Sequence, residues 1–428
     1  MNGVLTVGSG RPWESALVAA LDRSGSTFTV VRRCADIADL LTSATTGRAV
    51  VAVVDGNVRR FDSEAVDRLH SVGVAIVGIC GTSDPRTVHR LGQIGVHTVV
   101  DGGTGVAEII AAAARAVDHL ADLGPDTAVA GDPRRALPAG ARRRDGSVSG
   151  AEPTGGGGRV IAVWGPAGAP GRTTVAAGLA DAAAVHGVST VLVDADVYGG
   201  VLASAFGLLD ESPGLAGACR LAAHGRLEPA ELDRLCWSVA PGLRLLTGIA
   251  RADRWPEVRP SAVPGVLAVA RRLCALTVAD CGFSLESDEE LSYDTVAPRR
   301  NGATLSLLTH ADLVLVVGSA DPPGMERLIR GLGELAEAAP QIRPTVLLNR
   351  VRSSAASYPE AAEALLRFTG LEALAGLPED RRSTDAAWVR GSTLSRTAGG
   401  SALYAAFSRV TRILVPAAAV GRSAAVPR

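Results

Sequence analysis

The chain has 428 residues, 47% of them hydrophobic and 20% charged, so it has enough apolar material for two or three packed domains. Its 43 basic (Lys plus Arg) and 44 acidic side chains give a formal net charge of −1, which argues against a protein that coats nucleic acid by bulk electrostatics. The six cysteines stand singly, and no apolar run reaches the ~20 residues of a membrane-spanning helix. We therefore expect a cytoplasmic protein with reduced thiols and no cysteine metal site.

Residues 1–118 alternate short runs rich in β-branched residues with segments of helical spacing. The predicted strands are Val4–Val7, Phe28–Val31, Val50–Val54, Val74–Ile79 and His97–Val100. The predicted helices are Trp13–Ser24, Asp36–Ala44, Ser63–Val72, Pro85–Ile94 and Gly105–Val117. This alternation predicts an α/β domain with a doubly wound parallel sheet of the flavodoxin-like kind.

This first domain resembles a response-regulator receiver in size and topology, with Asp55 at the end of its third strand. Phosphorylation there would require further acidic residues after the first strand and a basic residue after the fifth. The sequence has Gly8–Arg11 and Asp101–Gly103 at those two places. We therefore interpret Asp55 as a turn or cap residue, and the domain as a degenerate receiver used for docking or self-association.

Residues 119–159 break the pattern, because they are rich in Gly, Pro and Arg and poor in apolar side chains. We interpret them as a flexible linker. Its Arg142–Arg144 cluster either is simply solvated or contacts acidic lipid or nucleic acid. At the other end of the chain, residues 415–428 are expected to form a disordered tail.

Residues 160–414 contain a second and larger α/β pattern, for which we again predict a doubly wound parallel sheet. Its predicted strands are Val160–Trp164, Thr190–Asp194, Leu243–Thr247, Leu276–Asp280, Leu313–Gly318 and Thr345–Asn349.

The first of these strands leads into G-P-A-G-A-P-G-R-T-T, from Gly165 to Thr174, and then into an alanine-rich helix. A glycine-rich turn before a helix N-terminus lets backbone N–H groups converge on a phosphate. The segment departs from the G-x-x-x-x-G-K-[ST] pattern, because Gly165 to Gly171 is one residue longer and Arg172 stands at the lysine position. The whole chain lacks lysine, so this arginine follows a general bias.

Polar side chains follow the other predicted strands of this domain at the same sheet edge. Asp194 and Asp196 end one strand, Asp280 ends the next buried strand, and Asn349 ends a later one. Ligands of open α/β sheets bind at the carboxyl ends of the strands. Four such features in order favour a nucleotide site over ordinary turn residues.

Residues 160–414 thus resemble the ParA/MinD superfamily of deviant-Walker P-loop ATPases (the SIMIBI class of P-loop NTPases). The resemblance rests on the loop and on V-D-A-D, A-D-C-G, A-D-L-V-L-V-V-G-S-A-D, L-N-R-V and G-L-P-E-D-R-R. The loop and the receiver-like domain in front of it resemble more narrowly the CpaE/TadZ branch, whose members act in placing and assembling Tad (Flp-type) pili.

The resemblance implies ATP and Mg²⁺ as cofactors and assigns roles to individual residues. The phosphates would be bound by Gly168, Ala169, Pro170, Gly171, Arg172, Thr173 and Thr174. Thr173 would ligate the metal, supported by Asp194 and Asp280, and Asp196 would orient the attacking water. Arg172 would act with Asp196 in catalysis, and Asn349 and Pro378 would border the adenine.

The resemblance also implies a homodimer, in which a signature lysine early in the loop reaches across to the partner's nucleotide. Pro166 and Ala167 occupy those positions here. Arg172 keeps a positive charge, but its planar fork fits a phosphate differently from an ammonium group. We therefore expect nucleotide binding to persist, with hydrolysis and ATP-driven dimerisation weakened.

Two further segments have alternative interpretations. The acidic stretch after Asp280, which contains Glu286 and precedes Arg299–Asn301, is either a switch loop facing a partner or a solvated loop. Leu403–Leu414 is amphipathic, and it either packs on the sheet or reaches the inner face of the cell membrane.

The leading functional hypothesis is a ParA/MinD-like ATP-binding protein, expected to be a weak ATPase. It would position a membrane-associated machine, above all the Tad pilus or a related secretion apparatus, and its partners would be that machinery. The first alternative is a catalytically degenerate scaffold that acts through protein–protein contacts. The second is a partitioning or septum-site ATPase; for partitioning, the near-neutral charge makes DNA an unlikely partner.

Overall fold

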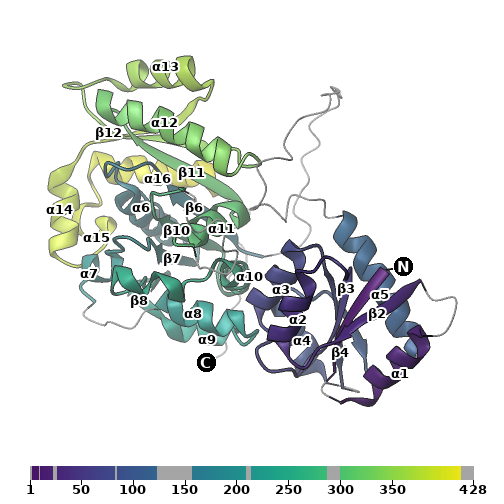
Figure 1. Cartoon of the computed structure of the whole chain (residues 1–428). Coiled ribbons are helices and arrows are strands. Elements are labelled where there is room, and N and C mark those ends of the chain that lie inside the picture. Colours follow the sequence, from purple (N-terminus) through teal and green to yellow (C-terminus); the bar gives the residue numbers. More distant parts are fainter. Residues whose placement is uncertain are drawn as a thin grey trace. The chain divides into compact units, whose positions relative to one another are not determined.

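The computed structural model describes residues 2–8, 10–22, 27–81, 84–122, 157–208, 214–286 and 299–415. The chain divides into two compact units, each with its own β-sheet and surrounding helices (Figure 1). The predicted α/β fold class is therefore confirmed. Most of the predicted linker (123–156) and of the predicted tail (416–428) lies outside the described residues.

The described strands of the N-terminal unit form a parallel sheet in the order β2-β1-β3-β4-β5. They are β1 (Asn2–Val7), β2 (Phe28–Arg33), β3 (Val51–Asp55), β4 (Ala75–Cys80) and β5 (Thr98–Asp101). The helices between and after them are α1 (Pro12–Leu21), α2 (Ile37–Ala44), α3 (Ser63–Ser71), α4 (Pro85–Gln93) and α5 (Val106–Asp122). This strand order is the flavodoxin-like one that the sequence predicts.

Aspartates set the start of several helices in this unit. The side chains of Asp36, Asp62 and Asp84 each accept a hydrogen bond from the backbone N–H three residues later, at 2.9, 3.0 and 3.1 Å. Each bond satisfies an N–H group that would lack a partner inside the helix. Helix α5 continues past the predicted Val117 as far as Asp122, the last described residue of this segment.

The C-terminal unit has a larger sheet, with the described strands in the order β13-β12-β11-β6-β10-β7-β9-β8. They are β6 (Arg159–Trp164), β7 (Thr190–Ala195), β8 (Cys236–Ala240), β9 (Leu243–Leu246), β10 (Leu276–Cys281), β11 (Leu313–Ser319), β12 (Thr345–Val351) and β13 (Ala373–Pro378). The sheet is mixed rather than purely parallel, because β8 pairs antiparallel with β9. Only Pro241 and Gly242 join these two strands, and so short a connection can join only antiparallel neighbours.

The helices of this unit lie between most of its strands and after the last one. They are α6 (Arg172–Val185), α7 (Leu202–Ala205), α8 (Gly214–Ala223), α9 (Pro229–Leu235), α10 (Val263–Leu273), α11 (Gly302–His310), α12 (Pro322–Ala338), α13 (Tyr358–Thr369), α14 (Arg381–Val389), α15 (Leu394–Ala398) and α16 (Ala402–Leu414), with 3₁₀ turns at Ala252–Glu257 and Pro260–Ala262.

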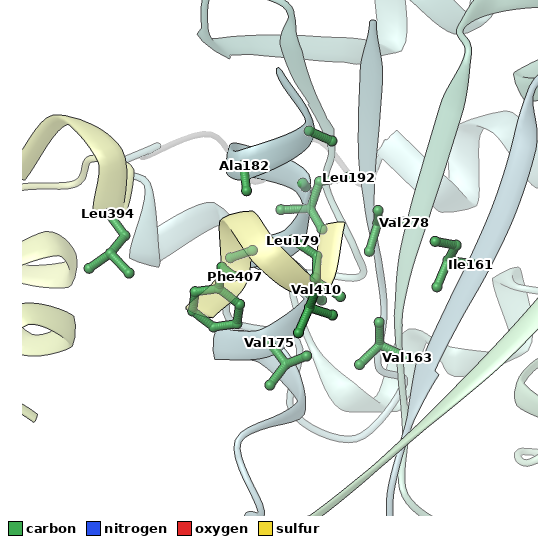
Figure 2. Close-up of a cluster of buried hydrophobic side chains, with 14 of the residues drawn as sticks. Ile161, Val163, Val175, Leu179, Ala182, Leu192, Val278, Leu394, Phe407 and Val410 are labelled. Carbon is green, nitrogen blue, oxygen red and sulfur yellow. The ribbon is translucent and has the colours of Figure 1, made fainter. Parts of the chain in front are cut away.

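Helix α6 lies inside the C-terminal unit, and every residue from Val175 to Ala183 is buried. One side of α6 packs on the sheet, and the other is covered by α16, whose Phe407 and Val410 lie against it (Figure 2). A helix with apolar residues on all sides requires such cover. Of the two interpretations of residues 403–414, the structure therefore shows a helix packed into the core, although Ile413 is exposed.

A buried carboxylate also fixes α6 to the segment before α16. Asp181 accepts hydrogen bonds from the backbone N–H and the hydroxyl of Ser395, at 2.7 and 2.6 Å. Burial raises the pKa of Asp181 above its usual range, and these bonds act against that shift. None of the helices built from described residues combines the length and the apolarity needed to cross a membrane.

Candidate functional site

The predicted site residues lie at one edge of the C-terminal sheet, where its parallel strands end. Strands β6, β10 and β7 are neighbours, and Asp280 pairs directly with Asp194 across β10 and β7. On its other side Asp280 pairs with Val163, shortly before Gly165 opens the loop. The fold therefore brings the loop and two of the predicted aspartates together.

The loop between β6 and α6 contains backbone conformations that few residue types adopt. Gly168, Ala169 and Gly171 have φ values of 98°, 53° and 97°, in the left-handed region that favours glycine. Gly171 also precedes the first turn of α6, which begins at Arg172. The free N–H groups of that turn and the helix dipole favour an anion at this place.

Two glycines of the loop also leave room for neighbouring groups. A Cβ atom on Gly165 would lie 2.3 Å from the carbonyl oxygen of Val317, and one on Gly171 would lie 2.3 Å from Nδ2 of Asn349. The Asn349 side chain is buried and donates a hydrogen bond to the carbonyl of Pro170 at 2.8 Å. In this structure Asn349 thus holds the loop, a contact that its predicted position beside adenine does not include.

The Arg172 side chain folds back over the loop, and only 12% of it is exposed. Its Nη1 donates to the carbonyl oxygens of Gly165 and Pro166, at 3.1 and 3.0 Å. Its Nη2 lies 3.8 Å from Oδ2 of Asp196, and its Cζ lies 5.9 Å from the ring centre of Phe283. The planar fork of an arginine reaches two carbonyls and a carboxylate at once, so the positive charge stays at the mouth of the loop.

Asp280 and Asp194 form a buried acidic pair beside the loop. Burial and the charge of Asp194 raise the pKa of Asp280 to about 8, although the Thr173 hydroxyl hydrogen-bonds to it. Burial raises the pKa of Asp194 to about 6, and its Oδ2 accepts the N–H of Leu202 at 3.0 Å. The other oxygen of each carboxylate has no hydrogen-bond partner among the described residues. Such buried oxygens next to a threonine hydroxyl fit a Mg²⁺ ion with its ligand water.

Asp196 follows β7 and makes a tight turn. Its Oδ1 accepts the N–H groups of Tyr198 and Gly199 at 2.9 and 3.2 Å, and its Oδ2 faces Arg172. The predicted catalytic pair, Arg172 and Asp196, is therefore brought into contact. This ion pair is largely shielded from water, which strengthens it relative to a surface pair.

An aromatic and polar cluster surrounds this turn, and its two aromatic residues are absent from the sequence predictions. The rings of Tyr198 and Phe283 lie 5.0 Å apart, and the Tyr198 hydroxyl donates to Oδ1 of Asn301 at 2.6 Å. The guanidinium of Arg300 lies 3.9 Å from the centre of the Tyr198 ring and donates to the Val197 carbonyl at 3.0 Å. The cluster thus joins the loop after β7, the loop after β10 and the start of α11.

The family described as the CobQ/CobB/MinD/ParA nucleotide binding domain matches residues 161–388, which is more than half of the 428 residues. The chain belongs to this family. The match contains the loop, the three aspartates and Asn349, so all of these residues lie within the MinD/ParA domain.

Solved structures are similar to this domain. A ParA family ATPase from Chlorobium tepidum TLS has a TM-score of 0.50 and 19% identity, over 59% of this chain and 98% of that one. The septum site-determining protein MinD complexed with Mg-ADP from Pyrococcus horikoshii OT3 has a TM-score of 0.49 and 17% identity, over 62% and 99%. At these identities the likeness concerns the fold alone. No curated protein matches the chain in sequence.

The other predicted residues of the MinD/ParA domain lie at the same edge but without a contact that defines their role. Thr174 is in the first turn of α6 and is half-buried. Pro378 ends β13 and pairs with Val351, two residues after Asn349. No group of three or more His, Cys, Asp or Glu side chains among the described residues could hold a metal alone, so a Mg²⁺ ion in this domain would rely on Thr173 and on phosphate oxygens. Glu286, expected in a switch loop, accepts a hydrogen bond from Asn301 through its carbonyl; residues 287–298 lie outside the described part of the chain.

The N-terminal unit has its own carboxylates at the sheet edge. Asp55 ends β3, where its Oδ1 accepts the N–H of Asn57 at 2.9 Å and its Oδ2 lies 3.3 Å from Nε of Arg11. Glu14, which the sequence analysis did not single out, is buried and accepts from the Thr6 hydroxyl at 2.7 Å and from Arg33 at 3.1 Å. Both carboxylates are thus bound to groups of the unit itself.

The buried acidic pair of the MinD/ParA domain predicts a pH dependence of stability. Both pKa values are raised above the ordinary 3.8, so the folded chain retains protons that the unfolded chain has lost. Without nucleotide, stability should therefore decrease as pH rises from about 4 to about 8, with the Asp280 contribution complete only near 8. Urea unfolding at several pH values should show a shallower decrease for Asp280→Asn. Asp253→Asn, at an exposed carboxylate, should keep the wild-type slope, and equal slopes for all three proteins would contradict the assignment.

Proposed function

We propose that this protein binds ATP with Mg²⁺ at the edge of its MinD/ParA domain and hydrolyses it slowly. The observation that carries the proposal is the buried pair Asp194 and Asp280. Each has an oxygen without a hydrogen-bond partner among the described residues, and Thr173, at the start of α6, hydrogen-bonds to Asp280. Unsatisfied buried carboxylate oxygens are costly unless a ligand completes them. The family assignment to a nucleotide binding domain supports the same conclusion.

The residues of the chain would act through their positions around the loop. The backbone N–H groups of the loop and of the first turn of α6 would bind phosphate oxygens. Thr173 would ligate the Mg²⁺ ion, and Asp280 would support it. That ion, when bound, neutralises charge on the terminal phosphates. Arg172 would turn from the Gly165 and Pro166 carbonyls towards the phosphate, and Asp196, released from it, would orient a water molecule.

Slow turnover follows from the same contacts. Arg172 has to give up two hydrogen bonds and its ion pair with Asp196 before it can bind phosphate. Ala167 contributes no charge to the loop. Because positioned charge supplies most of the catalysis in phosphoryl transfer, these two features reduce the rate more than they reduce binding.

Titration with a fluorescent ATP analogue and Mg²⁺ tests the proposal. Wild-type protein should show saturable binding, and Arg172→Ala and Thr173→Ala should each weaken it by roughly tenfold or more, the effect expected for loss of a charged or metal-bound contact. Thr309→Ala, on the exposed side of α11, and Arg330→Ala, on α12, serve as matched controls and should bind as the wild type does. Phosphate release, measured on the same samples, then gives the rate of turnover.

A folded wild-type protein that binds no nucleotide would contradict the proposal. That outcome would leave the alternative of a scaffold that acts through protein contacts alone. One observation favours this alternative: the Arg172 guanidinium has its partners within the chain, in two loop carbonyls and Asp196.

At the level of the cell, we propose that a homodimer of this protein positions a membrane-associated machine. A Tad pilus or related secretion apparatus is the proposed cargo, on the basis of the CpaE/TadZ-like loop and the receiver-like N-terminal unit, which would serve for docking. The cytoplasm and the inner face of the membrane are the proposed locations. A strain without this protein should lose its pili but keep chromosome partitioning and septum placement; a partitioning or septum defect with normal pili would favour the alternative.

A further inference from the structure

Arg327, on helix α12, places its positive charge against the loop between β6 and α6, although it is not part of that loop. A Cβ atom placed on Gly168 would lie 2.7 Å from Nη1 of Arg327 and 3.1 Å from its Cζ, so the guanidinium lies directly against this glycine. Gly168 thus serves twice: it accepts a positive φ, and it leaves room for the arginine.

The packing of α12 explains why the Arg327 side chain lies there. Gly331, one turn further along α12, approaches Pro166 so closely that a Cβ on it would lie 2.9 Å from the Pro166 Cβ. Residues four positions apart share one face of a helix, so Arg327 and Gly331 both face the loop. The next arginine, Arg330, is instead paired with Glu326 at 2.7 Å.

Arg327 has an exposed side chain and no hydrogen bond or ion pair with any described residue. An arginine on a surface helix ordinarily extends into water or pairs with an acidic neighbour. The Arg327 guanidinium lies against Gly168, in the loop that leads into the N-terminus of α6. An anion bound by this loop would therefore lie within reach of a guanidinium that has no competing partner in the described part of the chain.

We propose that Arg327 binds the terminal phosphate of a nucleotide held by the loop of the same chain, and so distinguishes ATP from ADP. This inference rests on the proposed function and adds a specificity residue to it. Pro166 and Ala167, at the start of the loop, carry no charge, so Arg327 supplies the positive charge on this side of the loop. A guanidinium can bind two oxygens of one phosphate, which suits a terminal phosphoryl group with three free oxygens.

Equilibrium binding of fluorescent ATP and ADP analogues to Arg327→Ala, Arg327→Lys and Arg330→Ala tests the assignment. Arg327→Ala should weaken ATP binding by roughly tenfold, as expected for loss of a charge-assisted contact, and change ADP binding by less than about twofold. Arg327→Lys, which keeps the charge, should recover part of the difference between ATP and ADP. Arg330→Ala should match the wild type with both nucleotides.

The results separate this inference from the proposed function. If the wild type binds ATP but Arg327→Ala has the same ratio of ATP to ADP affinity, the inference is wrong and the proposed function stands. If Arg327→Ala weakens ATP binding only at protein concentrations where two copies associate, Arg327 does not act on the nucleotide of its own chain, and the inference is wrong. If the wild type binds neither nucleotide, both proposals fail. If Arg327→Ala weakens the binding of ATP and of ADP equally, the role of Arg327 is purely structural, and the inference is also wrong.

Discussion

Replacing Gly171 with alanine is expected to weaken nucleotide binding by roughly tenfold to a hundredfold, because strain at such positions costs about 1–3 kcal/mol. Two independent effects add at this position. Its φ of 97° disfavours any side chain, and the new Cβ would lie 2.3 Å from Nδ2 of Asn349. Moving Asn349 would break its bond to the Pro170 carbonyl and release the loop. Titration with the ATP analogue measures the loss.

Gly187→Ala is the matched control for this prediction. Gly187 also has a positive φ, 83°, but no atom lies within 4 Å of a Cβ built on it. The Gly187→Ala variant should have a free energy of unfolding lower by about 1–2 kcal/mol, because alanine is strained in the left-handed region, but its nucleotide affinity should be unchanged. The double variant Gly171→Ala with Asn349→Ala removes the clash but keeps the φ penalty. Binding by Gly171→Ala equal to that of Gly187→Ala would contradict the described loop.

Replacing Phe407 with alanine is expected to lower the free energy of unfolding of the C-terminal unit by about 3–5 kcal/mol, the usual cost of removing a fully buried aromatic ring. Phe407 is completely buried between α16 and α6 (Figure 2). Denaturation followed by tryptophan fluorescence reports mainly this unit, because Trp13 is the only one of the five tryptophans in the N-terminal unit. Leu366→Ala, at an exposed position of α13, should change stability by less than about 0.5 kcal/mol.

A second substitution tests the contact itself. A Cβ on Gly178 would lie 2.4 Å from the Phe407 ring, so Gly178→Ala alone should destabilise by about 1–3 kcal/mol through overpacking. In the Phe407→Ala background the same change fills part of the cavity and adds a better helix former, so it should be neutral or stabilising. Additive effects of the two substitutions would show that α16 does not pack on α6 in this way.

The sequence predicts which side chains share the sheet edge wherever a residue follows a strand. Because parallel strands end at one edge, Asp194, Asp280 and the loop could be placed together from their positions alone. The order β2-β1-β3-β4-β5 follows from the same alternation of strands and helices. The antiparallel β8 was missed, although the two-residue Pro241–Gly242 connection is a signal for a hairpin.

Residues that act through tertiary contacts could not be predicted in this way. Tyr198 and Phe283 belong to no motif; the only signal is that aromatic residues make up just 4% of the chain, and both stand in loops that follow the site strands. Arg327 lies within a helix, at a position that no spacing rule connects with Gly168. The pairing of Arg172 with loop carbonyls depends on side-chain conformation, which a sequence pattern does not contain.

The hydrogen bonds between Asp181 and Ser395 join segments that leave the ribosome at very different times. These partners are 214 residues apart, and the helix that covers the outer side of α6 follows Ser395 in the chain. The nucleotide loop and α6 are therefore made early, while their cover leaves the exit tunnel last. Until then a nascent chain exposes the apolar outer side of α6, the kind of surface that chaperones bind. Folding of the N-terminal unit involves no such delay, because all its strands and helices are complete by Asp122.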